Sequence, residues 1–227
     1  MYHYTKFLVI VFLKQVLCYT KCGEMMRYIK ETVSHQIEID KSIFIAILYP
    51  IDHQEDILLC INDAKQKYPK ATHYCHASIF GINGEHQTLS DDGEPSRTAG
   101  IPILEVLKHH DVTNILCVVI RYFGGIKLGA GGLVRAYTKA SADVIKKVTF
   151  YVKKEVPIYK ISFDYDKINF IDKYFENDAI VLEKTYVEHV YYTLILLDQK
   201  VDRLDEIKHL LLSFEPLGMK TIQIDES

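Results

Sequence analysis

The sequence of 227 residues contains no tryptophan, no Cys-x-x-Cys pair and no apolar run of membrane-spanning length, and its formal net charge is only −3. The five cysteines are an odd number, which is typical of a reduced chain from the cytoplasm and not of a disulfide scaffold. The one short group of zinc-type ligands is His73, Cys75 and His76, and strand alternation sends His76 to the opposite face. We therefore expect no metal site and no cofactor.

The amino-acid composition of the chain favours a folded protein. Apolar residues make up 48% of the chain and charged residues 25%, which excludes disordered and collagen-like proteins. The charge is unevenly distributed, at +2 over residues 1–24, 0 over residues 25–150 and −5 over residues 151–227. Binding to a phosphate backbone requires a positive face, so the acidic C-terminal third is a poor candidate for it.

The first 24 residues differ from the rest of the chain. Their apolar run, residues 7–13, ends at Lys14, well short of the roughly 18 residues that a membrane-spanning helix needs. No small-x-small cleavage site follows, so the run does not resemble a secretory signal. Because Met25 and Met26 stand directly before the first expected strand, we hypothesise that residues 1–24 are an extension outside the fold.

Residues 25–149 are expected to form a first domain that mixes strands and helices. Apolar alternation and turn residues predict strands at 28–40, 42–49, 72–80, 87–89 and 114–123. Helical periodicity predicts helices at 52–67, 98–109 and 133–147. Thr98 is the expected N-cap of the second helix. The unbroken apolar run of 114–123 predicts a central strand that is covered on both faces.

Residues 156–227 are expected to form a second domain, after the charged stretch Lys153 to Glu155. The pattern predicts a strand at 156–165, a helix at 167–177, strands at 179–186 and 189–197, a helix at 201–213 and a strand at 217–224. This βαββαβ order is the ferredoxin-like arrangement of helices on an antiparallel sheet. The fold class expected for the whole chain is therefore α+β.

A glycine segment, residues 124–132, joins the expected central strand to the helix after it. Backbone N–H groups and the positive end of a helix dipole at such a place favour an anion. The candidates for an anion or RNA-phosphate contact are Arg121, Gly124, Gly125, Lys127, Gly129, Gly131, Gly132, Arg135 and Lys139. The spacing fits neither of the glycine motifs of nucleotide-binding proteins. The alternative is that these glycines provide positive φ angles and close helix-to-strand packing.

A second cluster, the acidic loop of residues 90–96, carries Asp91, Asp92 and Glu94. Three carboxylates so close together suit a cation or acid–base chemistry, but no histidine or nucleophile stands at a telling distance. The alternative is a turn that caps the helix at Thr98. We assign no catalytic residue.

Three segments together resemble the IMPACT family, which includes the bacterial YigZ-like proteins: ATHYCHA at 71–77, SDDGEPSRTAG at 90–100 and RYFGGIKLGAGGLVRAY at 121–137. The resemblance runs from about residue 26 to the C-terminus. Arg97 departs from it, since the family pattern usually has glycine there. The resemblance implies a ribosomal-protein-like α/β two-layer domain, similar to domain IV of elongation factor G, followed by a ferredoxin-like domain. It also implies a role in translation, which eukaryotic members regulate by binding a partner protein.

The leading hypothesis is a non-enzymatic cytoplasmic protein that associates with RNA or the ribosome and takes part in translation regulation. One alternative is a small-molecule enzyme or phosphometabolite-binding protein, in which the acidic loop and the glycine segment meet at one pocket. Another is a protein-binding module that uses the acidic second domain. We expect no membrane association, and the sequence leaves the oligomeric state open.

Overall fold

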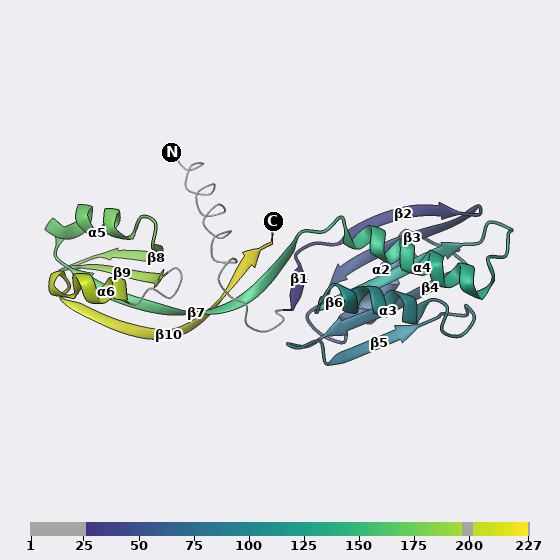
Figure 1. Ribbon diagram of the computed structural model, residues 1–227, viewed down its shortest axis with the longest axis horizontal. Coiled ribbons are helices and arrows are strands. Elements are labelled where there is room, and N and C mark those ends of the chain that lie inside the picture. The colour runs from purple at the N-terminus through teal and green to yellow at the C-terminus, as the bar shows by residue number, and fades with distance from the viewer. Residues whose placement is uncertain (1–25, 197–201, 227) are drawn as a thin grey trace. The chain divides into compact units, whose positions relative to one another are not determined.

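The computed structural model of the protein describes residues 26–196 and 202–226, so the expected extension 1–24 lies outside the described residues (Figure 1). The chain divides into two compact units. The N-terminal unit comprises residues 24–152 together with 225–227, and the C-terminal unit comprises residues 153–224. None of the helices in the described ranges is both long and apolar enough to cross a membrane.

The N-terminal unit is built on an antiparallel sheet of five strands in the order β2-β3-β6-β4-β5. Their bounds are β2 (Val33–Ile39), β3 (Ser42–Pro50), β4 (His73–Phe80), β5 (His86–Ser90) and β6 (Ile115–Tyr122). As expected, β6 lies at the centre, and its residues 115–120 are fully buried. A strand in that position must be apolar on both faces, because neither face contacts water.

Helices cover both faces of this sheet. Helix α2 (Asp56–Lys67) packs on the face that carries Ile45, Ile47 and Leu116. Helices α3 (Gly100–His109) and α4 (Gly129–Ile145) pack on the face that carries Phe44, Ala46 and Cys117. The unit therefore has three layers, whereas two were expected, because the alternate residues of β3 and β6 are apolar on either side.

The expected single strand 28–40 is two strands in the structure. After β1 (Arg27–Ile29) the chain bends, and β2 begins at Val33. Strand β1 does not join β2 and instead pairs with residues 150–152 at the start of β7 (Phe150–Phe163). Backbone hydrogen bonds from Arg27 N to Asp111 O and from Thr113 N to Arg27 O hold its start, at 2.8 and 2.9 Å.

The C-terminal unit has the expected βαββαβ order (Figure 1). Its elements are β7, α5 (Ile168–Phe175), β8 (Ala179–Tyr186), β9 (Val190–Leu196), α6 (Asp202–Ile207) and β10 (Ser213–Asp225), with short 3-10 turns at Tyr165–Lys167 and Lys208–Leu210. The strands pair in the order β10-β7-β9-β8. Apolar residues of α5 and α6 pack on Ile161, Tyr192 and Leu194 on one face of that sheet. The α+β class expected from the sequence is confirmed.

Candidate functional site

The acidic loop turns its first carboxylate toward the start of α3. Asp91 Oδ1 accepts hydrogen bonds from the backbone N–H groups of Ala99 and Gly100 at 3.0 and 2.8 Å, and Oδ2 accepts one from Arg97 N–H at 2.8 Å. Burial alone raises the pKa of Asp91, but these three donors outweigh it and leave the pKa below its ordinary value. Asp91 therefore caps α3 from eight residues upstream.

Thr98 is not the N-cap of this helix, contrary to the sequence prediction. Ala99 occupies the N-cap position, and the Thr98 hydroxyl donates instead to Pro95 O at 2.6 Å. Arg97 adopts a φ of +66°, in the left-handed region where glycine is favoured. Glycine would adopt this backbone conformation with less strain than arginine. The hydrogen bond from Arg97 N–H to Asp91 holds the loop in this conformation with arginine present.

Asp92 is likewise engaged within the fold. Its Oδ2 accepts a hydrogen bond from Tyr74 N–H at 2.6 Å, and its backbone carbonyl lies 2.7 Å from His73 Nδ1. The loop is thereby fastened to the beginning of β4.

Glu94 is the centre of a buried polar cluster. Its side chain is 3% exposed, and its Oε1 accepts hydrogen bonds from Arg121 Nη1 at 2.7 Å and from Tyr137 Oη at 2.8 Å. Cys75 Sγ lies 3.3 Å from the same Tyr137 hydroxyl, and burial raises the pKa of that thiol to about 12. Burial also raises the pKa of Tyr137. Cys75 stays protonated near neutral pH and is a poor nucleophile.

Arg121 was expected to contact an anion at the surface, and the structure does not support that role. The side chain is only 6% exposed, forms the ion pair with Glu94, and lies 5.5 Å from the ring centres of both Phe44 and Phe123. A buried charged side chain needs a partner that compensates its charge. The ion pair therefore explains why Arg121 and Glu94 are both buried. The enzyme alternative required the acidic loop and the glycine segment to meet at one pocket. The Glu94–Arg121 pair instead joins the acidic loop to the central strand inside the protein.

The glycine segment is divided between a loop and a helix. The loop spans residues 123–128, and α4 begins at Gly129, four residues earlier than expected, so that Gly129, Gly131 and Gly132 lie in its first turn. A Cβ at Gly124 would lie 2.0 Å from the backbone of Lys41, so this glycine permits a close approach of two chain segments. Gly125 and Gly129 have φ values of +86° and +68°, so the structural explanation accounts for these glycines as well.

The first turn of α4 is open at its N-terminus. Leu128 occupies the N-cap position without a side-chain hydrogen bond, and residues 129–131 are exposed. Lys127 is exposed beside it, and the Arg135 guanidinium lies over Gly131, 3.6 Å from where a Cβ would stand. Lys139, another candidate, forms an ion pair with Asp143 at 2.6 Å. Of the predicted cations, Lys127 and Arg135 are the two that remain exposed and unpaired among the described residues.

Further cations gather at the same edge of the sheet. The register pairs Ile43 and His73 with the last residues of β6, so the β2–β3 turn and the start of β4 lie beside the glycine segment. We call the exposed cations of this edge the basic surface: Lys41, Lys70, Arg97, Lys127 and Arg135. Within residues 26–196 and 202–226, none of the five has a carboxylate partner within ion-pair distance.

Lys41 and Lys70 were missed by the sequence analysis. Each stands in a turn with a positive φ, +63° in both cases; Lys41 directly precedes β3, and Lys70 lies three residues before β4. A lysine in a turn does not by itself indicate a binding site. Only the strand order brings these two turns to the glycine segment.

Exposed apolar side chains accompany these cations. Phe123 is 49% exposed and Ile126 is 44% exposed, both in the loop before α4. An aromatic ring among cations is the combination on which nucleotide bases stack in single-stranded RNA complexes.

The described ranges contain no group of three His, Cys, Asp or Glu side chains arranged to hold a metal ion. Asp91 and Asp92 bind backbone groups, and Glu94 binds Arg121 and Tyr137. The arrangement therefore gives no support to a metal-dependent site built on the acidic loop.

Comparison with known proteins points to one family. The model of the Impact N-terminal domain matches residues 40–145. The chain is 36% identical over 179 residues to the IMPACT family member YvyE of Bacillus subtilis, a match that covers 78% of this chain and 82% of that protein. It is 37% identical over 137 residues to the IMPACT family member YigZ of Escherichia coli, covering 60% and 67%. Among solved structures, the crystal structure of a hypothetical protein matches with a TM-score of 0.55 and 28% identity, covering 88% of this chain and 99% of that one.

Proposed function

The chain belongs to the IMPACT family, and on that premise we propose that it is a non-enzymatic cytoplasmic protein that binds RNA or the ribosome and contributes to translation regulation. The contact surface in this proposal is the basic surface around the start of α4. This surface differs from the one expected from the sequence. It leaves out Arg121 and Lys139 and adds Lys41, Lys70 and Arg97.

The basic surface is the observation that carries the proposal. Five exposed cations without ion-pair partners among the described residues lie at the same edge of the sheet as the uncapped N-terminus of α4. Unpaired cations attract phosphates, and an uncapped N-terminus adds backbone donors and the positive end of the helix dipole. The formal charge of −3 does not oppose this, since affinity depends on the charge of the face that binds.

The exposed ring of Phe123 favours single-stranded RNA over a duplex within this proposal. A-form duplexes bury their bases, whereas bases in loops and single strands are free to stack on an aromatic side chain. Phe123 also lies over the buried Arg121, so the ring is held at the base of the loop.

The enzyme alternative is less well supported, because it needs the acidic loop to face a substrate. The three carboxylates of that loop instead bind groups of the protein itself. The protein-binding alternative depends on the acidic C-terminal unit, and the charge of that unit remains its only support.

Co-sedimentation of the full chain with ribosomes and their subunits, over a series of salt concentrations, tests the proposal. We expect binding at low salt that is lost as salt rises, and binding about 10- to 100-fold weaker for Lys41→Ala/Lys127→Ala/Arg135→Ala. The matched control removes three exposed lysines of the C-terminal unit, Lys173→Ala/Lys208→Ala/Lys220→Ala, and should bind as wild type does. Absence of binding to ribosomes and to single-stranded RNA at low salt would contradict the proposal.

A further inference from the structure

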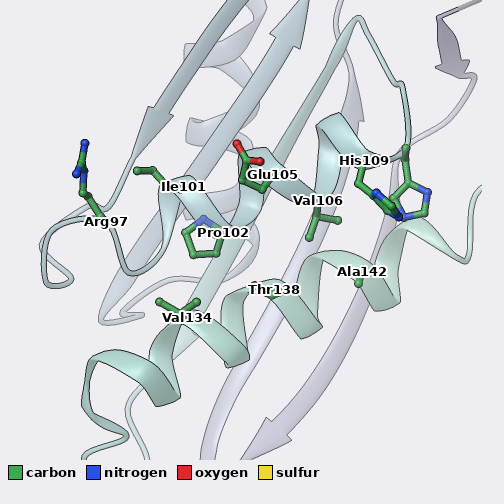
Figure 2. A pocket seen from close by; sticks show the side chains of 10 residues that line it. Arg97, Ile101, Pro102, Glu105, Val106, His109, Val134, Thr138 and Ala142 are labelled. Carbon is green, nitrogen blue, oxygen red and sulfur yellow. The ribbon is translucent and has the colours of Figure 1, made fainter. Parts of the chain in front are cut away.

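A groove of about 500 Å³ lies between α3 and α4, on the side away from the sheet (Figure 2). Figure 2 shows that one wall is a row of small side chains along α4 and the other is formed by α3. The apolar lining consists of Ile101, Pro102, Val106, Val134, Thr138 and Ala142. These α4 residues are spaced four apart, so they form a single stripe along the helix.

One end of the groove is positively charged. Arg97 stands at that end and His109 stands at the other (Figure 2), and His110 also belongs to the lining. Burial, His109, Arg27 and Lys146 lower the pKa of His110, which favours the neutral form of this histidine. The single carboxylate in the lining is Glu105, and Lys108 pairs with it at 3.4 Å. An occupant that fits is a convex apolar ridge with acidic side chains at one end.

The opposite side of the same unit carries such a ridge. On α2, Leu58 is 64% exposed and Leu59 is 66% exposed, and they are the largest exposed apolar side chains of that helix. Two exposed acidic residues, Asp52 and Glu55, precede them at the start of the helix. Adjacent exposed leucines are costly in water and mark contact sites.

The two features match in length as well as in charge. The α4 wall from Val134 to Ala142 is about 12 Å long, and the α2 ridge from Glu55 to Asn62 is about 10 Å long, at 1.5 Å per residue. They lie on opposite faces of one sheet, so a chain cannot place its own α2 in its own groove.

We propose that the groove between α3 and α4 binds helix α2 of a second copy of this chain. Leu58 and Leu59 enter the apolar lining, and the acidic start of α2 faces Arg97 at the cationic end of the groove. The contact is head to tail, so each copy uses its ridge on one neighbour and its groove on another, and growth continues until a ring closes. With so small an interface, the expected dissociation constant is on the order of 100 µM.

Sedimentation velocity of the full chain from about 5 to 500 µM tests this inference. We expect the sedimentation coefficient of the wild type to rise with concentration. Leu59→Lys alters the ridge, Ala142→Glu alters the groove, and each alone should leave the protein monomeric. Asn169→Glu adds the same negative charge as Ala142→Glu, at an exposed position of α5, and is the matched control for that variant, which should associate as wild type does.

Mixing the two altered chains gives the sharper test. The Ala142→Glu chain keeps a wild-type ridge and the Leu59→Lys chain keeps a wild-type groove, so the mixture should form a 1:1 dimer that grows no further. A wild-type chain that stays monomeric at 500 µM would overturn the inference. So would association that survives both substitutions, or altered chains that fail to combine while their circular dichroism and thermal unfolding match wild type. None of these outcomes depends on whether RNA binds.

Discussion

The acidic loop and the glycine segment lie at the same edge of one sheet and face opposite ways. The acidic loop turns its charges inward, where Glu94 holds Arg121 and Asp91 holds the start of α3. The glycine segment leaves Lys127 and Arg135 exposed. The acidic loop therefore stabilises this edge of the sheet, and the glycine segment is free to contact a ligand.

The largest effect is expected at Glu94. Glu94→Gln removes the charge that compensates the buried Arg121 guanidinium, and breaking a buried pair in this way costs about 3–5 kcal/mol. Urea unfolding of the two proteins measures the difference. Glu105→Gln, at an exposed ion pair, is the control and should change the free energy by less than about 0.5 kcal/mol. Equal effects at the two positions would show that the acidic loop is not structural.

The next effect is expected at Gly124. Gly124→Ala places a Cβ 2.0 Å from the backbone of Lys41, and the required shift costs about 1–3 kcal/mol, measured by the same unfolding experiment. Gly125→Ala is the comparison, because its Cβ would meet nothing within 4 Å, and only the strain of its φ of +86° remains, at about 1 kcal/mol. A larger loss at Gly125 than at Gly124 would contradict the close-approach explanation.

A smaller effect is expected at Asp91. Asp91→Asn weakens the cap of α3 and should cost about 1–2 kcal/mol at neutral pH. The pKa of Asp91 is lowered in the folded protein, so its contribution is complete above the unfolded pKa and is lost as pH falls through the folded pKa. Unfolding curves measured from pH 7 to pH 2 should therefore converge for wild type and Asp91→Asn at the acid end. A difference that stays constant over this range would refute the ionised cap.

The smallest effect on stability is expected where the glycine segment faces solvent. Lys127→Ala/Arg135→Ala removes two exposed cations without ion-pair partners in the described part of the chain, and unfolding should change by less than about 0.5 kcal/mol. Thermal unfolding followed by circular dichroism checks this. A loss above 1 kcal/mol would mean that these side chains support the fold as Glu94 does, and the contrast between the two segments would disappear.

Much of the fold was predictable because its signals are local. The apolar run of β6 and the βαββαβ order of the second unit depend on patterns within a few residues. The start of α4 was placed too late, since three glycines in its first turn have a low helix propensity. The cap of α3 was assigned to Thr98 because an acceptor eight residues away, Asp91, leaves no local signal.

The candidate site was predictable only in part. Lys127, Arg135 and the glycines were found because they are adjacent in the chain. Arg121 was misplaced because its partner Glu94 is 27 residues away, and sequence spacing does not show that a charge is buried. Lys41 and Lys70 were missed because strand pairing, and no motif, brings their turns to this edge.

We propose that Lys127 and Arg135 bind phosphate, whereas the buried Glu94–Arg121 pair serves only to stabilise this edge of the sheet. The most direct test is the affinity of the full chain for a labelled single-stranded RNA as a function of salt, for wild type and for Lys127→Ala/Arg135→Ala. We expect the slope of log affinity against log salt to become shallower by about 1.4 in the variant, which corresponds to two lost phosphate contacts on a single strand. An unchanged slope, with the RNA still bound, would contradict it.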